Sequence, residues 1–123
     1  MIIAVDFDGT VVTYEYPKIG DSIGAEPVLK KLVEAGHKLI LLTMRSGDTL
    51  AEAVKWFEQK GIPLYGVNYN PTQSEWTSSN KCYAQLYIDD AALGCPVIAS
   101  EYYHRVFVDW GKVEELLKMR RLI

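Results

Sequence analysis

Polar side chains follow four of the short apolar runs of this sequence, at the point where each run ends. They are Asp6, Asp8 and Thr10 after the first run, Thr43 and Arg45 after the second, Asn68 after the third, and Asp89 and Asp90 after the fourth. Carboxylates gathered with a hydroxyl group and a cation can bind a hard divalent metal ion and support phosphoryl transfer. The chemistry requires a fold that brings the ends of the runs together.

Four aspartates, Asp6, Asp8, Asp89 and Asp90, would repel one another strongly in a shared pocket. Two carboxylates about 4 Å apart repel by roughly 4 kcal/mol at an effective dielectric constant near 20. Lys81, a few residues before the fourth run, supplies one compensating charge, and a divalent ion would supply two more. Because the ligands are oxygen atoms with no His or Cys beside them, we expect Mg²⁺ rather than zinc or copper.

Phosphoryl transfer gives these side chains distinct roles. An aspartate beside Mg²⁺ can attack phosphorus, because the metal ion screens the repulsion between the two anions. A second carboxylate two residues further along can act as general acid and then as general base. A threonine hydroxyl and a lysine ammonium can neutralise and orient the phosphoryl oxygens.

Five short apolar runs alternate with longer segments, three of which have the pattern of helices. The runs are residues 2–5, 39–42, 64–67, 86–88 and 106–108. Continuous apolar residues are typical of strands buried on both faces of a parallel sheet. Helices are expected near 27–36, near 49–61 and after Asp109, a residue type that favours helix N-caps.

This alternation predicts an α/β fold: one three-layer, Rossmann-like domain spanning residues 1–123. We expect a mostly parallel five-stranded sheet with helices on both faces. Ligands of such sheets bind at the carboxyl ends of the strands. The polar residues named above follow those ends, so they are predicted to share one pocket.

Length and composition exclude several classes of protein. With 123 residues, 49% hydrophobic and 24% charged, the chain can form one folded domain without disulfides. No apolar run approaches the roughly 18 residues of a membrane helix. The net charge of −3 argues against a nucleic-acid partner. Two cysteines and no signal-peptide pattern favour a cytoplasmic location.

At these residues the sequence resembles the haloacid dehalogenase superfamily, a group of phosphatases with an aspartate nucleophile. The string DFDGT at 6–10 is similar to the first motif of that superfamily, Thr43 to the second, Lys81 to the third, and Asp89 with Asp90 to the fourth. The resemblance implies that Asp6 is the nucleophile and Asp8 the general acid and base. It further implies that Thr43 and Lys81 are catalytic residues that bind the phosphoryl group, with Thr10 beside them.

The resemblance also implies a Mg²⁺ site formed by Asp6, the Asp8 backbone carbonyl and Asp89. Asp90 is either a further, water-mediated metal contact or a partner of Lys81. The intervals between the motifs are too short for the cap domain of many superfamily members, so the site is expected to be capless. Water must then be excluded by short loops, by the substrate or by a second copy of the chain.

Two segments and one further residue are candidates to shape such an open site. Residues 10–18, with Tyr14 and Tyr16, are similar to the small flap of the superfamily. The long loop 68–80 is a candidate lid or subunit contact. Arg45 is placed to bind a second anionic group of the substrate. The expected substrate is a small phosphorylated metabolite, either a sugar phosphate or a nucleotide.

The leading hypothesis is therefore a Mg²⁺-dependent phosphomonoester hydrolase with a phosphoaspartyl intermediate on Asp6. A phospho-accepting signalling domain of the receiver type is one alternative. It would need an acceptor aspartate after the third strand, where this chain has Asn68. A metal-binding protein that keeps the fold without catalysis is the other alternative. Phosphate release from an ester distinguishes the first hypothesis from both.

Overall fold

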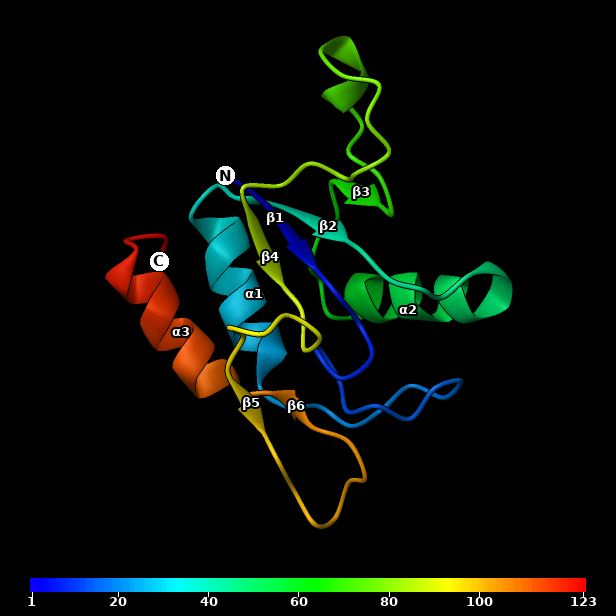
Figure 1. Ribbon diagram of the computed structural model, residues 1–123, viewed down its shortest axis with the longest axis vertical. Coiled ribbons are helices and arrows are strands. Elements are labelled where there is room, and N and C mark those ends of the chain that lie inside the picture. The colour runs from blue at the N-terminus through cyan, green and yellow to red at the C-terminus, as the bar shows by residue number, and fades with distance from the viewer.

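Four parallel strands form the main sheet, in the order β3-β2-β1-β4 (Figure 1). The computed structural model describes all residues of the chain, 1–123. The strands are β1 (Ile2–Val5), β2 (Lys38–Leu41), β3 (Gly66–Val67) and β4 (Leu86–Ile88). Val5, the last residue of β1, pairs with Leu41 and Ile88, the last residues of its two neighbours. These three strands therefore end in register at one edge, as the predicted parallel sheet requires.

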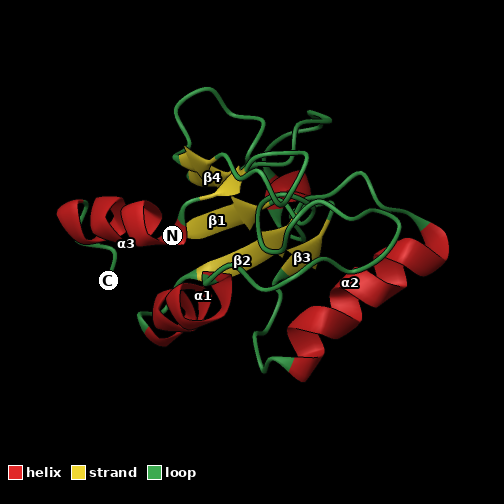
Figure 2. Ribbon diagram, turned by 90° about the horizontal axis from the view of Figure 1, so that it is seen from below, coloured by secondary structure: helices red, strands yellow, loops and turns green.

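Three helices cover the sheet, and all of them pack on the same face (Figure 2). They are α1 (Ala25–Glu34), α2 (Gly47–Gln59) and α3 (Trp110–Met119). One core of 21 buried residues joins alternate strand residues, such as Ile3 and Leu39, to side chains of every helix. The strand residues between them, Ala4 and Ile40, belong to a separate cluster with the loop residue Ala84.

The prediction of helices on both faces is wrong for this protein. The right-handed crossovers from β1 to β2 and from β2 to β3 run in one direction, so α1 and α2 lie on one face. The return from β3 to β4 runs in the opposite direction, and a helix there would cover the other face. That connection contains only the short 3₁₀ helix η1 (Gln73–Glu75), and loop residues such as Tyr65 and Cys82 cover part of the sheet instead.

The fifth apolar run does not join the main sheet, which corrects the prediction of five strands. It forms β6 (Phe107–Val108), which pairs antiparallel with β5 (Val97–Ile98) in a separate two-stranded sheet. Val108 is buried, and its N–H donates to the Gly9 carbonyl oxygen at 3.0 Å. The apolar pattern of this run indicated burial, but it did not indicate that the partner would be the loop after β1.

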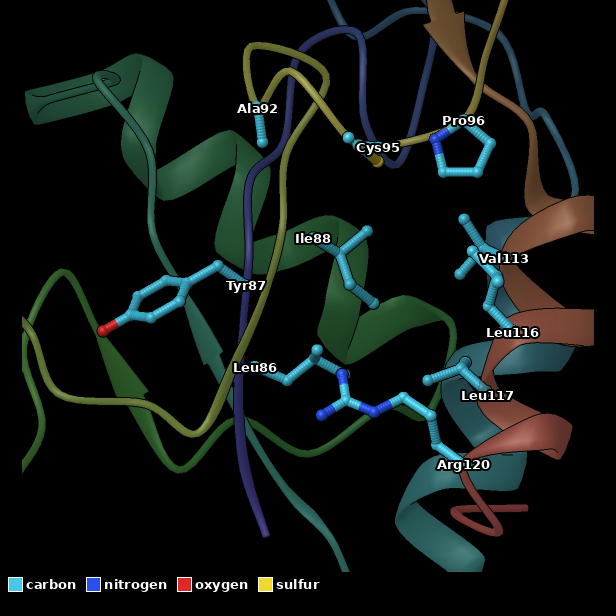
Figure 3. A pocket seen from close by; sticks show the side chains of 11 residues that line it. Leu86, Tyr87, Ile88, Ala92, Cys95, Pro96, Val113, Leu116, Leu117 and Arg120 are labelled. Atoms are coloured by element: carbon cyan, nitrogen blue, oxygen red, sulfur yellow. The ribbon is translucent and has the colours of Figure 1, made fainter.

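An apolar hollow lies beside β4, the last strand at this side of the main sheet. It has a volume of about 380 Å³ and separates β4 from α3 (Figure 3). Leu86 and Ile88 of β4 lie across it from Val113 and Leu117 of α3. The main sheet therefore ends at β4, and the β5–β6 hairpin extends past its carboxyl edge (Figure 1).

Two helix boundaries follow signals that are visible in the sequence. The Asp109 side chain accepts a hydrogen bond from the Lys112 N–H, which confirms the predicted N-cap of α3. The turn after α1 contains Gly36 with a φ of 92°, a conformation that favours glycine. None of the helices combines the length and apolar character needed to cross a bilayer.

Candidate functional site

Asp6, Thr10 and Asp90 form a hydrogen-bonded cluster at the carboxyl edge of the sheet. The buried Thr10 hydroxyl lies 2.9 Å from Asp6 Oδ2 and 3.0 Å from Asp90 Oδ1, and donates its single proton to one of them at a time. The same hydroxyl accepts from the Asp90 N–H at 3.0 Å. The predicted convergence of the first and fourth motifs is thus present. Thr10, however, links two aspartates and does not offer a free hydroxyl to a substrate.

Asp6, Asp89 and Asp90 form an acidic triad in which one carboxylate oxygen of each residue lies within 4.8 Å of one from each of the other two. Burial, followed by repulsion from Asp89, raises the pKa of Asp6 from 3.8 to about 7. Closely spaced oxygen donors that are costly to ionise together fit a hard divalent cation, whose charge offsets their repulsion. The triad is therefore the part of the predicted site best suited to hold a metal ion.

The raised pKa of Asp6 predicts a pH-dependent stability when divalent cations are removed. The folded protein holds the Asp6 proton up to about pH 7, whereas the ordinary pKa of an aspartate side chain is 3.8. The free energy of unfolding should therefore fall as the pH rises between these values. In EDTA we expect a lower melting temperature at about pH 8 than at about pH 5, and Mg²⁺ should raise it more at the higher pH. Scanning calorimetry tests this, and equal stabilisation by Mg²⁺ at both pH values would contradict it.

Asp8 lines the same pocket, but Arg45 holds its carboxylate. Arg45 Nε donates to Asp8 Oδ2 at 2.8 Å, and Nη2 donates to Oδ1 at 2.7 Å. The other three donor bonds of the guanidinium go to the carbonyl oxygens of Pro17, Lys18 and Thr49. Since a guanidinium has five N–H groups and this side chain is 1% exposed, no donor is left for a substrate. The prediction that Arg45 binds substrate is therefore corrected: Arg45 positions Asp8.

The segment that follows Asp8 folds back beside the pocket, as expected of the predicted flap. Isolated bridges join Val12 to Asp8 and to Ser22. Tyr14 and Tyr16 line the pocket, and the Tyr16 ring centroid lies 5.2 Å from the Arg45 guanidinium carbon. One wall of the site is therefore built from this segment of the chain.

Thr43 lines the pocket two residues beyond the end of β2, as predicted. Its N–H donates to Asn68 Oδ1 at 2.7 Å, so Asn68 fixes the turn that carries it. Its hydroxyl oxygen accepts from the Arg45 N–H at 3.2 Å. The proton of this hydroxyl has no acceptor within the protein and is free to bind an anion.

Lys81 lies outside this pocket, and the structure does not bring it to its predicted catalytic position. It precedes the amino end of β4, whereas Asp89 and Asp90 follow the carboxyl end. Its ammonium lies 5.5 Å from the centroid of the Tyr87 ring and lines a different hollow. The segment between β3 and β4 extends beyond the amino ends of the strands (Figure 1). Asp90 therefore has Thr10, rather than Lys81, as its partner.

Arg105 is a pocket residue that reasoning from the sequence missed. It lies just before β6, and its guanidinium carbon is 3.8 Å from the centroid of the Tyr14 ring. It lines the same pocket as the aspartates, a hollow of about 440 Å³. Its position directly before the apolar run 106–108 was the signal in the sequence that could have marked it as a residue at the end of a strand. That run was expected in the main sheet, where the residue before it would lie at the amino edge, away from the site.

Gly9 allows Asp90 to approach the loop after β1. Its φ is 80°, and a Cβ there would lie 2.7 Å from Asp90 Oδ2. Gly9→Ala should therefore displace the Asp90 carboxylate and weaken Mn²⁺ binding. The alanine would also introduce a backbone strain of about 1–2 kcal/mol, because it must adopt a positive φ. Gly61→Ala is the matched control, because Gly61 has a φ of 70° and open space around its Cβ position. Calorimetric Mn²⁺ titration tests this, and an unchanged affinity of the Gly9→Ala variant would contradict it.

The fold and the pocket together define an α/β protein with an acidic site at the carboxyl edge of a parallel sheet. A solved structure of a conserved protein from Bacteroides thetaiotaomicron is similar to it, with 38% sequence identity and a TM-score of 0.79. The match covers 98% of this chain and 91% of that chain. The chain therefore belongs to the same family as that conserved protein. No protein-family model matches the chain, and no curated protein matches it.

Proposed function

We propose that this protein is a Mg²⁺-dependent phosphomonoester hydrolase that forms a phosphoaspartyl intermediate on Asp6. One observation carries the proposal: Asp6, Asp89 and Asp90 each place a carboxylate oxygen within 4.8 Å of the other two, at the edge of the sheet where ligands of such folds bind. The resemblance of residues 6–10 to the haloacid dehalogenase superfamily supports the same reaction. The proposed substrates are small phosphate monoesters such as sugar phosphates and nucleoside monophosphates.

Asp6, Asp89 and Asp90 are the proposed ligands of Mg²⁺. When bound there, Mg²⁺ supplies the positive charge that offsets the carboxylates and draws a phosphate monoester toward Asp6. The Thr43 hydroxyl, which has a free proton, donates to a phosphoryl oxygen and orients it.

The proposed reaction has two displacements at phosphorus. In the first, a carboxylate oxygen of Asp6 bonds to phosphorus, the bond to the leaving-group oxygen breaks, and Asp8 gives that oxygen a proton. In the second, water attacks phosphorus, its proton passes to Asp8, and phosphate leaves as the Asp6 carboxylate is restored. Because Arg45 holds both oxygens of Asp8, one of these contacts must open when Asp8 carries the proton.

Phosphate release from a panel of phosphate esters tests the proposal. With Mg²⁺ we expect release from p-nitrophenyl phosphate and from at least one sugar phosphate or nucleoside monophosphate, and EDTA should abolish it. Failure of the folded protein to release phosphate from any ester would overturn the proposal. If Mg²⁺ then still raised the melting temperature, the alternative of a non-catalytic metal-binding protein would be favoured.

A further inference from the structure

Two cations line the acidic pocket, and only one of them is free. All five N–H groups of Arg45 are bonded to Asp8 and to backbone carbonyls. Arg105 forms neither a salt bridge nor a side-chain hydrogen bond with the protein, and its side chain is exposed. Lys81, the cation predicted to bind the phosphoryl group, lines a different hollow. Any cation of this chain that meets a substrate in the pocket is therefore Arg105.

The structure holds Arg105 in place through its neighbours. Its guanidinium lies over the Tyr14 ring, with 3.8 Å between the guanidinium carbon and the ring centroid. Stacking uses the face of the guanidinium and leaves its N–H groups free to form a fork to two oxygens. Arg105 lies in the loop between β5 and β6. The Tyr103 hydroxyl of the same loop donates to Asp21, a residue just beyond the flap, so this hydrogen bond holds the loop beside the flap. The Val108 N–H bond to Gly9 anchors the other end of the same loop.

We propose that Arg105 binds the phosphoryl group of the substrate, and that the pocket selects phosphate monoesters whose remaining part carries no charge. This inference rests on the proposed function and supplies the cation that Lys81 does not. Arg45 is committed to Asp8 and to backbone carbonyls, Arg105 is assigned to the phosphoryl group, and no third cationic side chain lines the pocket. A second phosphate on the substrate would therefore meet no positive side chain.

The rim of the pocket fits an uncharged remainder. Met44 is 98% exposed and Tyr16 is 50% exposed, and both line the opening. A thioether and a phenol ring offer contact area to a sugar or an aromatic group but no charge to a second anion. Nucleoside diphosphates and bisphosphorylated sugars should accordingly be poor substrates.

Arg105→Ala tests the binding role in two independent ways. With p-nitrophenyl phosphate, KM should rise about 10- to 100-fold, the loss typical of a charge-assisted hydrogen bond, while kcat changes less. The dissociation constant of inorganic phosphate, measured by calorimetry with Mg²⁺ present, should rise by a similar factor. Arg105→Lys keeps the charge but not the planar fork of N–H groups, so its KM and phosphate dissociation constant should lie between those of the wild type and Arg105→Ala. Arg120→Ala, at an exposed arginine of the α3 end, is the matched control.

The outcomes separate this inference from the proposed function. An unchanged KM and an unchanged dissociation constant of phosphate in Arg105→Ala would overturn the role of Arg105 while hydrolysis stands. A rise in both constants caused by Lys81→Ala instead would do the same. Arg105-dependent phosphate binding without hydrolysis of any ester would overturn the proposed function alone. For selectivity, kcat/KM for a hexose monophosphate should exceed that for the matching bisphosphate at least about tenfold. Equal values would contradict the predicted selection.

Discussion

Replacing Asp6 with asparagine is expected to abolish phosphate release and to raise the melting temperature. An amide cannot attack phosphorus, so kcat should fall at least about a thousandfold, as on removal of other nucleophiles. Asparagine also carries no charge, so the free-energy cost of burying a carboxylate and its repulsion from Asp89 both disappear. In EDTA at about pH 8 the variant should melt at a higher temperature than the wild type, with a flatter dependence on pH. Phosphate-release assays and scanning calorimetry on one preparation measure both effects.

The matched control for this experiment is Glu115→Gln. Glu115 is exposed on α3 and makes no ion pair, so this variant should leave activity and melting temperature close to those of the wild type. Near wild-type hydrolysis by Asp6→Asn would show that another group attacks phosphorus. A lower melting temperature of the same variant would show that the hydrogen bond from Thr10 outweighs the repulsion within the triad.

Replacing Arg45 with methionine should lower the free energy of unfolding by about 3–5 kcal/mol, the loss expected when one partner of a buried ion pair is removed. The Arg45 side chain is 1% exposed and that of Asp8 is 10% exposed, so solvent cannot replace the lost contacts. The carbonyl oxygens of Pro17, Lys18 and Thr49 would lose a donor as well. Urea unfolding followed by circular dichroism measures the change.

Two further variants separate the charge pair from the backbone contacts. Arg45→Lys keeps the charge but not the planar fork, so its loss should be smaller than that of Arg45→Met. Combining Asp8→Asn with Arg45→Met removes the unpaired carboxylate and should recover part, not all, of the stability, because the carbonyl oxygens stay unpaired. A loss below about 1 kcal/mol for Arg45→Met would contradict a buried pair and resemble a surface salt bridge.

The four strands of the main sheet and the convergence of Asp6 with Asp89 were predictable from the sequence. Continuous apolar runs indicate strands buried on both faces, and parallel strands expose their following residues at a common edge. The structure confirms this placement because Val5 and Ile88 pair directly before the two aspartates. Thr43 reached its predicted position for the same reason.

The cations of the site were not predictable, since their partners depend on the paths of loops. Arg45 lies shortly after the carboxyl end of β2, where a substrate ligand is expected. Its five N–H groups nevertheless all donate to oxygen atoms of the protein. Lys81 stays at the amino edge because it lies just before the amino end of β4. Arg105 reaches the pocket because β6 pairs with β5 and not with β4. An apolar pattern indicates that a strand is buried, but it does not indicate which strand it pairs with. The positions of these cations depend on that pairing and on the loops.

The most direct test of the central claim is a crystal structure of the protein with Mn²⁺ and trifluoroberyllate, a mimic of a phosphoryl group bonded to a carboxylate. We predict beryllium bonded to an Asp6 carboxylate oxygen, anomalous density for Mn²⁺ among Asp6, Asp89 and Asp90, and the Arg105 guanidinium within hydrogen-bond distance of fluorine. Beryllium on a different aspartate, or Mn²⁺ bound elsewhere with the triad empty, would contradict the account.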